Sequence, residues 1–218
     1  MKTRLSVPAL LICSAISLPT HADFSASVDI ANLYLFRGLN LSQGSPVVAG
    51  DLNYRHSSGL NAGVWSSSGD DTAGTEVNYH VGFSGEVQEL GYHLQYLNYY
   101  YPASKGTTNA IVNPDDFAEV TAALDYRGLS ASATAPTRHQ VAGKYVYYTL
   151  AWRYRTLAAT LGLNAHQKDS NDYSHLDVAW QFNDNLSFVI SQVLDKGRGS
   201  TLADATLWQV RFQLPITF

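Results

Sequence analysis

The chain has 218 residues, with 14 lysines and arginines against 18 aspartates and glutamates, and a formal net charge of −4. It shows no basic stripe and no nucleic-acid motif, which argues against DNA or RNA as a partner. No apolar run after Ala22 is long enough to cross a bilayer as a helix. A membrane protein with this sequence would therefore have to be a β-barrel, because only helices and closed barrels satisfy their backbone groups in lipid.

The first 22 residues have the pattern of a cleavable secretory signal peptide. Lys2 and Arg4 precede a mostly apolar stretch at residues 5–18, which is too short for a transmembrane helix, and a Thr-His-Ala cleavage site follows it. We expect residues 1–22 to be removed and residues 23–218 to form a single domain. The only cysteine lies inside the leader, so we expect no disulfide in the mature chain.

The mature part alternates between apolar and polar side chains in about twelve stretches of roughly ten residues, the length expected of transmembrane strands. Strand side chains point to opposite faces with a period of two, so each stretch predicts a strand with one apolar and one polar face. In chain order the expected strands cover residues 24–37, 47–56, 60–66, 75–87, 90–101, 116–126, 129–135, 144–154, 157–165, 173–182, 186–194 and 205–218.

The connections between these strands alternate in length. Those after odd-numbered strands are long and polar, whereas those after even-numbered strands are tight turns such as Arg127-Gly128. Outer-membrane barrels have long extracellular loops and short periplasmic turns. We therefore predict an all-β fold, a single transmembrane antiparallel up-and-down barrel in the outer membrane of a Gram-negative bacterium, with both termini in the periplasm. The alternative, a soluble β-sandwich, gives no reason for this alternation.

Aromatic side chains are expected at both membrane edges, where amphipathic rings collect. Near the long loops these are Tyr99, Tyr100, Tyr101, Tyr145, Tyr147 and Tyr148. Near the tight turns they are Tyr54, Tyr126, Tyr154, Trp180, Phe182 and Phe218.

The last strand, residues 205–218, has an almost purely apolar face opposite Arg211. It is similar to the C-terminal signature of outer-membrane barrels, which place an aromatic residue last. We expect it to pair with residues 24–37 and to close the barrel, with Pro215 at a frayed end or a bulge because proline lacks a backbone donor. The expected assembly signal, read by the barrel-assembly machinery, consists of Phe212, Leu214, Ile216 and Phe218.

The polar faces should line the lumen, because charged side chains are costly on the lipid face. Eight strands leave a packed interior and sixteen a wide channel, so twelve should leave a narrow passage. Its charged groups would set selectivity, as charge rings do in channels; the alternative is a salt-bridged plug. The candidate lumen residues are Asp29, Arg37, Asp51, Arg55, Glu76, His80, His93, Glu119, Asp125, Arg127, Arg153, His175, Asp177 and Arg211.

One motif near the start of the mature chain has a Phe-Arg-Gly…Ser-Gln…Pro pattern, made by Phe36, Arg37, Gly38, Ser42, Gln43 and Pro46. In this motif the chain resembles the Gcw_chp family, also called TorF-type porins, proteobacterial outer-membrane barrels of poorly known function. The likeness continues through residues 51–56 and 81–86 and covers most of the mature chain. Two extra residues, Leu39-Asn40, separate Arg-Gly from Ser-Gln here. The resemblance implies an outer-membrane barrel and says little about a solute.

These observations favour a narrow porin-like channel for small polar solutes. We expect no cofactor, no metal site and no enzymatic activity. The expected partners are outer-membrane lipid, lipopolysaccharide, the assembly machinery and a small polar solute.

The alternatives are a non-conducting structural or adhesin-type barrel and, less favoured, an outer-membrane hydrolase. A hydrolase would need a serine within hydrogen-bond reach of a base. The nearest pair is His56 with Ser57 or Ser58, which lies at the tight-turn end, and no Gly-x-Ser-x-Gly elbow occurs. The spacing of His166, Asp169, Asp172 and His175 would suit a metal loop by ligand type, but a solvated loop running into a strand is the simpler interpretation.

Overall fold

The computed structural model describes residues 22–70, 74–102, 117–137, 145–166, 172–197, 202 and 205–216. Two short strands of this part, β2 (Leu35–Phe36) and β3 (Leu39–Asn40), form a separate hairpin. The wall strands are β1 (Ala22–Ala31), β4 (Val47–His56), β5 (Leu60–Asp70), β6 (Gly74–Val87), β7 (Leu90–Tyr100), β8 (Ala118–Tyr126), β9 (Leu129–Pro136), β10 (Tyr145–Tyr154), β11 (Leu157–His166), β12 (Tyr173–Gln181), β13 (Leu186–Lys196) and β14 (Leu207–Ile216). Within the described ranges, no helix is long and apolar enough to cross a membrane.

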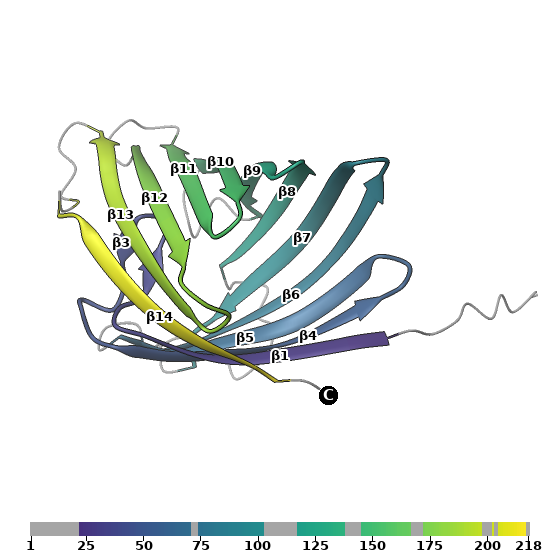
Figure 1. Ribbon diagram of the computed structural model, residues 1–218, viewed down its shortest axis with the longest axis horizontal. Helices are drawn as coiled ribbons and strands as arrows, with labels where there is room; N and C mark the ends of the chain where they lie inside the picture. The colour runs from purple at the N-terminus through teal and green to yellow at the C-terminus, as the bar shows by residue number, and fades with distance from the viewer. Residues whose placement is uncertain are drawn as a thin grey trace, which may run out of the picture.

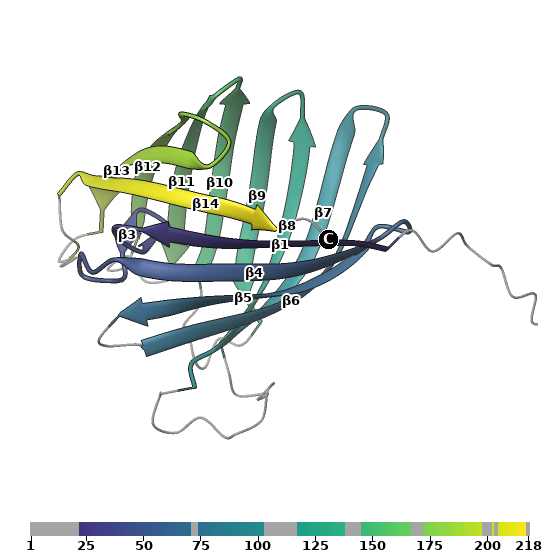
Figure 2. The same ribbon diagram turned by 60° about the horizontal axis from the view of Figure 1, so that its bottom comes forward.

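The twelve wall strands described here form one closed antiparallel barrel (Figures 1 and 2). Each strand pairs with its sequence neighbour, and β1 also pairs with β14, so that Ala26 lies opposite Ile216. The predicted pairing of the first and last strands is therefore confirmed. Pro215 is the penultimate residue of β14, at the end of the ladder, where a missing backbone donor costs least.

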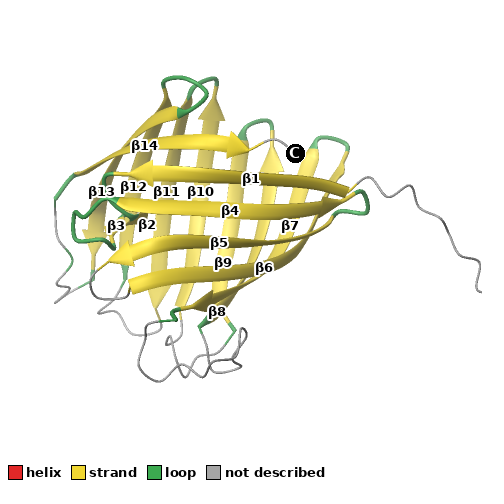
Figure 3. Cartoon of the chain, turned by 90° about the horizontal axis from the view of Figure 1, so that it is seen from below, coloured by secondary structure: helices red, strands yellow, loops and turns green. Residues whose placement is uncertain are grey.

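The tight turns gather at one end of the barrel (Figure 3). Gln88, Arg127 and Arg155 adopt left-handed backbone angles, with φ of 59°, 47° and 52°, as two-residue hairpin turns require. The first residue of β1, Ala22, lies opposite His56, the last residue of β4, so the chain enters the wall at this tight-turn end. The opposite end, which carries the connection between β1 and β4, is called the long-loop end below.

Apolar side chains cover the outside of the wall. Leu94, Leu150 and Trp208 are 54%, 55% and 63% exposed, whereas side chains of the opposite parity such as Asp29 and Glu119 are buried. An exposed apolar surface of this extent marks contact with a membrane, and the alternation along every strand is that of a transmembrane barrel. The predicted all-β barrel fold is confirmed.

The prediction that the first strand covers residues 24–37 is wrong beyond Ala31, where β1 ends. Val28 and Ile30 do face outward, but the chain leaves the wall at Asn32. The Asn32 side chain donates to the Trp208 carbonyl (2.9 Å) and accepts from the Val210 amide (2.7 Å). This side chain satisfies backbone groups of β14 that a longer β1 would have paired, so the backbone is free to turn inward.

Candidate functional site

The segment between β1 and β4 folds into the barrel at the long-loop end as the β2–β3 hairpin (Figures 1 and 3). Its turn is Arg37-Gly38, with φ of 51° and 79°, and two left-handed residues in succession make a tight hairpin turn. A Cβ atom on Gly38 would lie 2.6 Å from Cβ of His175, so the tip also needs glycine for space. The extra Leu39-Asn40 pair of the family motif forms β3.

The base of the hairpin is held by short-range hydrogen bonds. The Leu41 amide donates to the Tyr34 carbonyl (2.8 Å), which closes the hairpin. Ser42, 1% exposed, accepts from the Tyr34 amide (2.9 Å) and donates to the Ser45 carbonyl (2.7 Å). Ser42 of the family motif thus serves to shape the inward loop.

The tip of the hairpin is tied to the far wall through Arg37. Its Nη2 lies 2.7 Å from Oε2 of Glu119 on β8, with the two side chains 13% and 1% exposed. Tyr99 donates to the same carboxylate (2.7 Å), and Tyr145 donates to its other oxygen. A buried carboxylate is tolerated when it is paired and hydrogen-bonded, as Glu119 is here.

Aromatic rings enclose the Arg37 guanidinium, whose Cζ lies 4.4 Å from the ring centroid of Tyr147 and 4.7 Å from that of Phe36. Such cation–π contacts strengthen as the cation loses water. Burial lowers the pKa of Arg37, but the hydrogen bond to Glu119 and the charge of that carboxylate outweigh it and hold the pKa above its ordinary value. Arg37 is therefore permanently charged. Its contacts with Glu119 and the surrounding rings, which hold the hairpin tip in place, are called the Arg37 latch below.

A second polar chain supports this latch from β10 and β12. The Tyr147 hydroxyl lies 2.8 Å from Nε2 of His175, whose Nδ1 lies 3.0 Å from Oδ1 of Asp177. His175 is fully buried between the hairpin tip and Gly162 of β11, where a Cβ atom would come within 2.1 Å of Nε2. The register between β12 and β13 shifts at Ser174/His175, an irregularity of the kind that re-aims a side chain.

The near side of the hairpin packs on β5 and β6. The rings of Tyr34 and Trp65 lie 5.7 Å apart, and the Tyr34 hydroxyl donates to Oε2 of Glu76 (3.2 Å). Burial, together with the negative charge of Glu76, raises the pKa of Tyr34, so this phenol stays a neutral donor. The hairpin thus touches strands on several sides of the lumen and narrows it.

A cavity of about 150 Å³ remains beside the base of the hairpin. The Asp29–Arg211 pair forms one side of this cavity, and Tyr34 and Trp65 form another. Nε and Nη2 of Arg211 each lie 3.1 Å from an oxygen of Asp29, a bidentate geometry that holds the guanidinium against the wall. The lumen is therefore constricted at this level but retains a polar gap.

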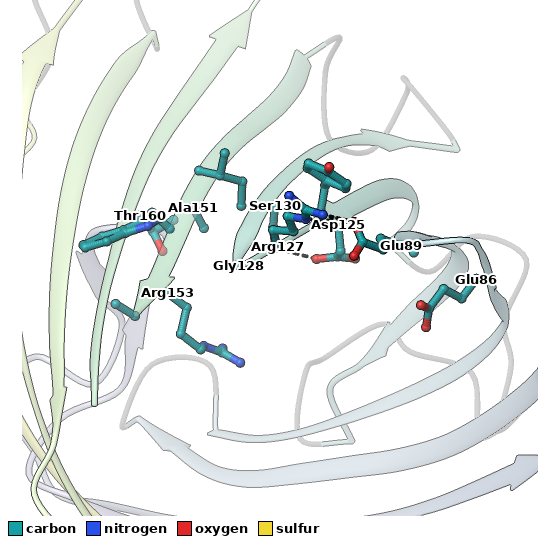
Figure 4. A pocket seen from close by; sticks show the side chains of 14 residues that line it. Glu86, Glu89, Asp125, Arg127, Gly128, Ser130, Ala151, Arg153 and Thr160 are labelled. Atoms are coloured by element: carbon teal, nitrogen blue, oxygen red, sulfur yellow. Dashed lines mark hydrogen bonds and ion pairs between the residues drawn. The ribbon is translucent and has the colours of Figure 1, made fainter. Parts of the chain in front are cut away.

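Toward the tight-turn end the lumen opens into two larger cavities, of about 390 Å³ and 510 Å³. The first is lined by acidic and basic side chains that converge from β6 to β11 (Figure 4), among them Glu86, Glu89, Asp125, Arg127 and Arg153. The second lies against the opposite part of the wall and is lined by Asp23, Arg55, Asn61, His80 and His93.

The structure places most of the expected lumen residues on the inner parity of the wall. These are Asp29, Asp51, Arg55, Glu76, His80, His93, Glu119, Asp125, Arg153, His175, Asp177 and Arg211. Arg37 reaches the lumen from the hairpin and not from the first strand. Arg127, also a lumen candidate, lies in the expected tight turn between β8 and β9 at the rim, where it pairs with Glu89 (2.6 Å) and its side chain is 66% exposed.

The sequence-based placement of three tyrosines at the membrane edge was wrong. Tyr99, Tyr145 and Tyr147 point inward and hold the Arg37 latch, whereas Tyr148 is 46% exposed on the outer face. The sequence does contain a sign of this orientation, because Tyr145 and Tyr147 have the same parity as Arg153 on the same strand and so lie on its polar face. At the tight-turn end Tyr126, Tyr154, Trp180 and Phe182 do face outward.

Three residues of the expected assembly signal face outward as expected, with Phe212, Leu214 and Ile216 exposed by 48%, 54% and 43%, and their role in assembly stays a prediction. Phe218 lies outside the described residues. Its role in assembly stays a prediction.

Two serine–histidine contacts occur within the described ranges, and neither forms a triad. Nδ1 of His56 lies 2.8 Å from Oγ of Ser58 in the β4–β5 turn, and Nδ1 of His93 lies 2.7 Å from Oγ of Ser84. Serine hydrolases use Nε2 for the serine and Nδ1 for an orienting acid. In the part of the chain that the structure covers, no carboxylate bonds either imidazole.

The candidate metal loop is not assembled by its described members. Nδ1 of His166 lies 3.7 Å from Oδ1 of Asp172, while His175 is buried under the hairpin, and Asp169 falls outside the described residues. Among the residues that are described, no three potential ligands gather around one point.

The fold and the polar interior define a transmembrane β-barrel whose first loop folds into its lumen. A solved porin has a similar fold. "KdgM porin" matches with a TM-score of 0.50 and 6% identity, covering 90% of this chain and 99% of that chain. "KdgM porin in complex with disordered oligogalacturonate" gives a TM-score of 0.47 at the same identity and coverage. At this identity the likeness concerns the fold alone.

The chain belongs to the family Gcw_chp, described as a bacterial protein of unknown function, whose profile matches residues 18–197. The family resemblance of the sequence is thereby confirmed. No curated protein matches the chain.

Proposed function

We propose that this protein is an outer-membrane channel for small polar solutes, narrowed by the β2–β3 hairpin. The observation that carries the proposal is a polar lumen that is open at the tight-turn end and keeps a cavity of about 150 Å³ beside the base of the hairpin. The apolar outer face supports a location in the outer membrane of a Gram-negative bacterium. Tight turns face the periplasm in such barrels, so we infer that both termini lie there.

Small hydroxyl side chains on one side of the lumen, at its middle, favour the passage of a solute. Thr121 and Thr134 are hydrogen-bonded across β8 and β9 (2.8 Å), and Ser132 and Thr149 across β9 and β10 (2.6 Å). Small side chains leave space, and their hydroxyls replace part of the hydration of a passing solute. The constriction limits the size of that solute, since the cavity beside the hairpin measures only about 150 Å³.

A second candidate, a non-conducting barrel with a structural or adhesive role, is favoured by the hairpin itself. Its contacts reach Glu76 on β6, Glu119 on β8 and His175 on β12. A hairpin held on several sides is the arrangement expected of a plug. The two candidates differ in whether the gap beside the hairpin base is continuous with the long-loop end.

Planar-bilayer recording of the purified, folded protein separates the two candidates. We expect the native chain to give small, steady current steps, and a variant with residues 35–40 replaced by a short glycine-serine link to give larger ones. Current from the replacement variant alone would identify a plug. Silence from both, with folding verified by heat-modifiable electrophoretic mobility, would refute the channel.

The proposal assigns no enzymatic activity and no cofactor to the barrel. Its partners would be outer-membrane lipid, lipopolysaccharide and, through the outer face of β14, the assembly machinery. Hydrolysis of lipid or protein by intact cells that is lost on changing Ser84 or His93, whose side chains touch at 2.7 Å, would count against a channel without catalysis.

A further inference from the structure

Charges at the constriction do not balance. Arg37 is matched by Glu119 and Arg211 by Asp29, so these four side chains cancel in pairs. We propose that the remaining carboxylates, above all Asp51 and Asp177, make the constriction select cations over anions. This inference rests on the proposed channel function and specifies its solute class.

Asp51 lies on the inner parity of β4, just below the hairpin. Its register partner on β5 is Trp65, the residue whose ring packs against Tyr34 of the hairpin. Its carboxylate accepts hydrogen bonds from Ser27 and Asn53, both of which are neutral. Hydrogen bonds of this kind orient the carboxylate without cancelling its charge.

Asp177 lies on the inner parity of β12, four strands from β4 around the wall. It is hydrogen-bonded to His175, the side chain that lies against Gly38 at the hairpin tip. Its side chain is 22% exposed, so the carboxylate still meets the water of the lumen.

Glu76 adds a third carboxylate at the same level, and none of the basic side chains that the structure describes forms an ion pair with it. It accepts from Tyr34 (3.2 Å) and Asn78 (2.7 Å) and is 3% exposed. Because the hairpin covers it, it acts on a passing ion at longer range than Asp51 or Asp177.

The other described guanidinium groups lie at the tight-turn end. Arg55 and Arg153 line the two wide cavities there, and Arg127 and Arg155 sit in turns. In a wide mouth filled with electrolyte, charges are screened within a Debye length of about 8 Å at 0.15 M salt. At the long-loop end, Lys196 ends β13 next to Asp195 and donates to the Leu202 carbonyl (2.8 Å).

Fixed charge therefore acts most strongly where the lumen is narrowest, because low-dielectric walls focus the field there. A carboxylate about one Debye length from the ion path attracts a cation and repels an anion by similar amounts. With screening, this changes the cation-to-anion permeability ratio about twofold per carboxylate. Charged side chains at pore constrictions set selectivity in this way in channels.

The test is the reversal potential of the folded protein in a planar bilayer under a KCl gradient at pH 8. We expect potassium to permeate better than chloride. Asp51→Asn and Asp177→Asn should each lower the ratio about twofold, and the double variant about fourfold. Asparagine has the shape of aspartate and keeps a hydrogen-bonding side chain, so the barrel should still fold.

Two controls make the result specific. Asp184→Asn removes a carboxylate from the exposed β12–β13 turn and should leave the ratio unchanged. Asp177→Glu keeps the charge and should retain the native preference.

Chloride preference in the native protein, or an unchanged ratio in the double variant, would overturn the inference while leaving a channel in place. A folded barrel without current would instead remove the proposed function and this inference with it.

Discussion

Removal of Arg37 tests the latch that holds the hairpin across the lumen. In Arg37→Ala, Glu119 keeps its two tyrosine donors but loses the cation 2.7 Å away, although it is only 1% exposed. Breaking a buried ion pair from one side costs about 3–5 kcal/mol, because the remaining charge is left uncompensated. Water can enter this lumen, so we take the lower value of about 3 kcal/mol, which shifts the docked-to-undocked equilibrium of the hairpin about a hundredfold.

Two measurements read this shift. Single-channel conductance should rise as the tip leaves the constriction, and amide hydrogen exchange over residues 32–46 should accelerate, above all at Leu41, whose amide closes the hairpin. The wall should keep its exchange protection, because its strand ladder does not depend on Arg37.

The double variant Arg37→Ala/Glu119→Gln supplies the control. With no charge left unpaired, it should protect the hairpin better than Arg37→Ala alone, although it has lost both partners of the salt bridge. Native conductance and native exchange in Arg37→Ala would refute the reasoning, since the tip would then be held without its ion pair.

Three further outcomes are expected. Gly38→Ala should loosen the hairpin and raise the single-channel conductance. Alanine at φ 79° is strained by about 1 kcal/mol, and its Cβ would clash with His175. An unchanged current would show that the tip can shift at no cost. Leu150→Lys on the outer face should destabilise the folded barrel in lipid by about 2–4 kcal/mol, measured by urea unfolding in vesicles. Thr149→Lys, on the lumen face of the same strand, should destabilise it less. Equal losses of stability would contradict the assigned faces. Deletion of Phe218 should reduce assembly in cells, measured as folded protein in the outer membrane, more than it changes ion selectivity, and normal insertion of that truncation would argue against an assembly signal.

The sequence was sufficient for the wall of the barrel. The alternation of side chains between the two faces of a strand is a local property, so it can be recognised from each segment without knowing its neighbours in the sheet. The pairing of β14 with β1 could also be predicted. With an even number of strands and alternating long and tight connections, the first and last strands run antiparallel and can pair with each other.

The candidate site was only partly accessible in this way. Parity alone identified Glu119, His175 and Asp177 as lumen residues, yet it could not show that they meet. They lie on β8 and β12, separated in the sequence by more than fifty positions, and only closure of the sheet brings both to the same hairpin.

The inward hairpin was decided by the tertiary structure. Tyr34 and Phe36 keep the parity of Val28 and Ile30, so the local pattern predicts more strand. The side chain of Asn32 bonds the backbone of β14 and releases the chain, while Glu119 and the ring of Tyr147 stabilise Arg37 inside the barrel. A guanidinium is stable in such a place because a buried carboxylate and aromatic faces lie together there, and that coincidence exists only in the folded chain.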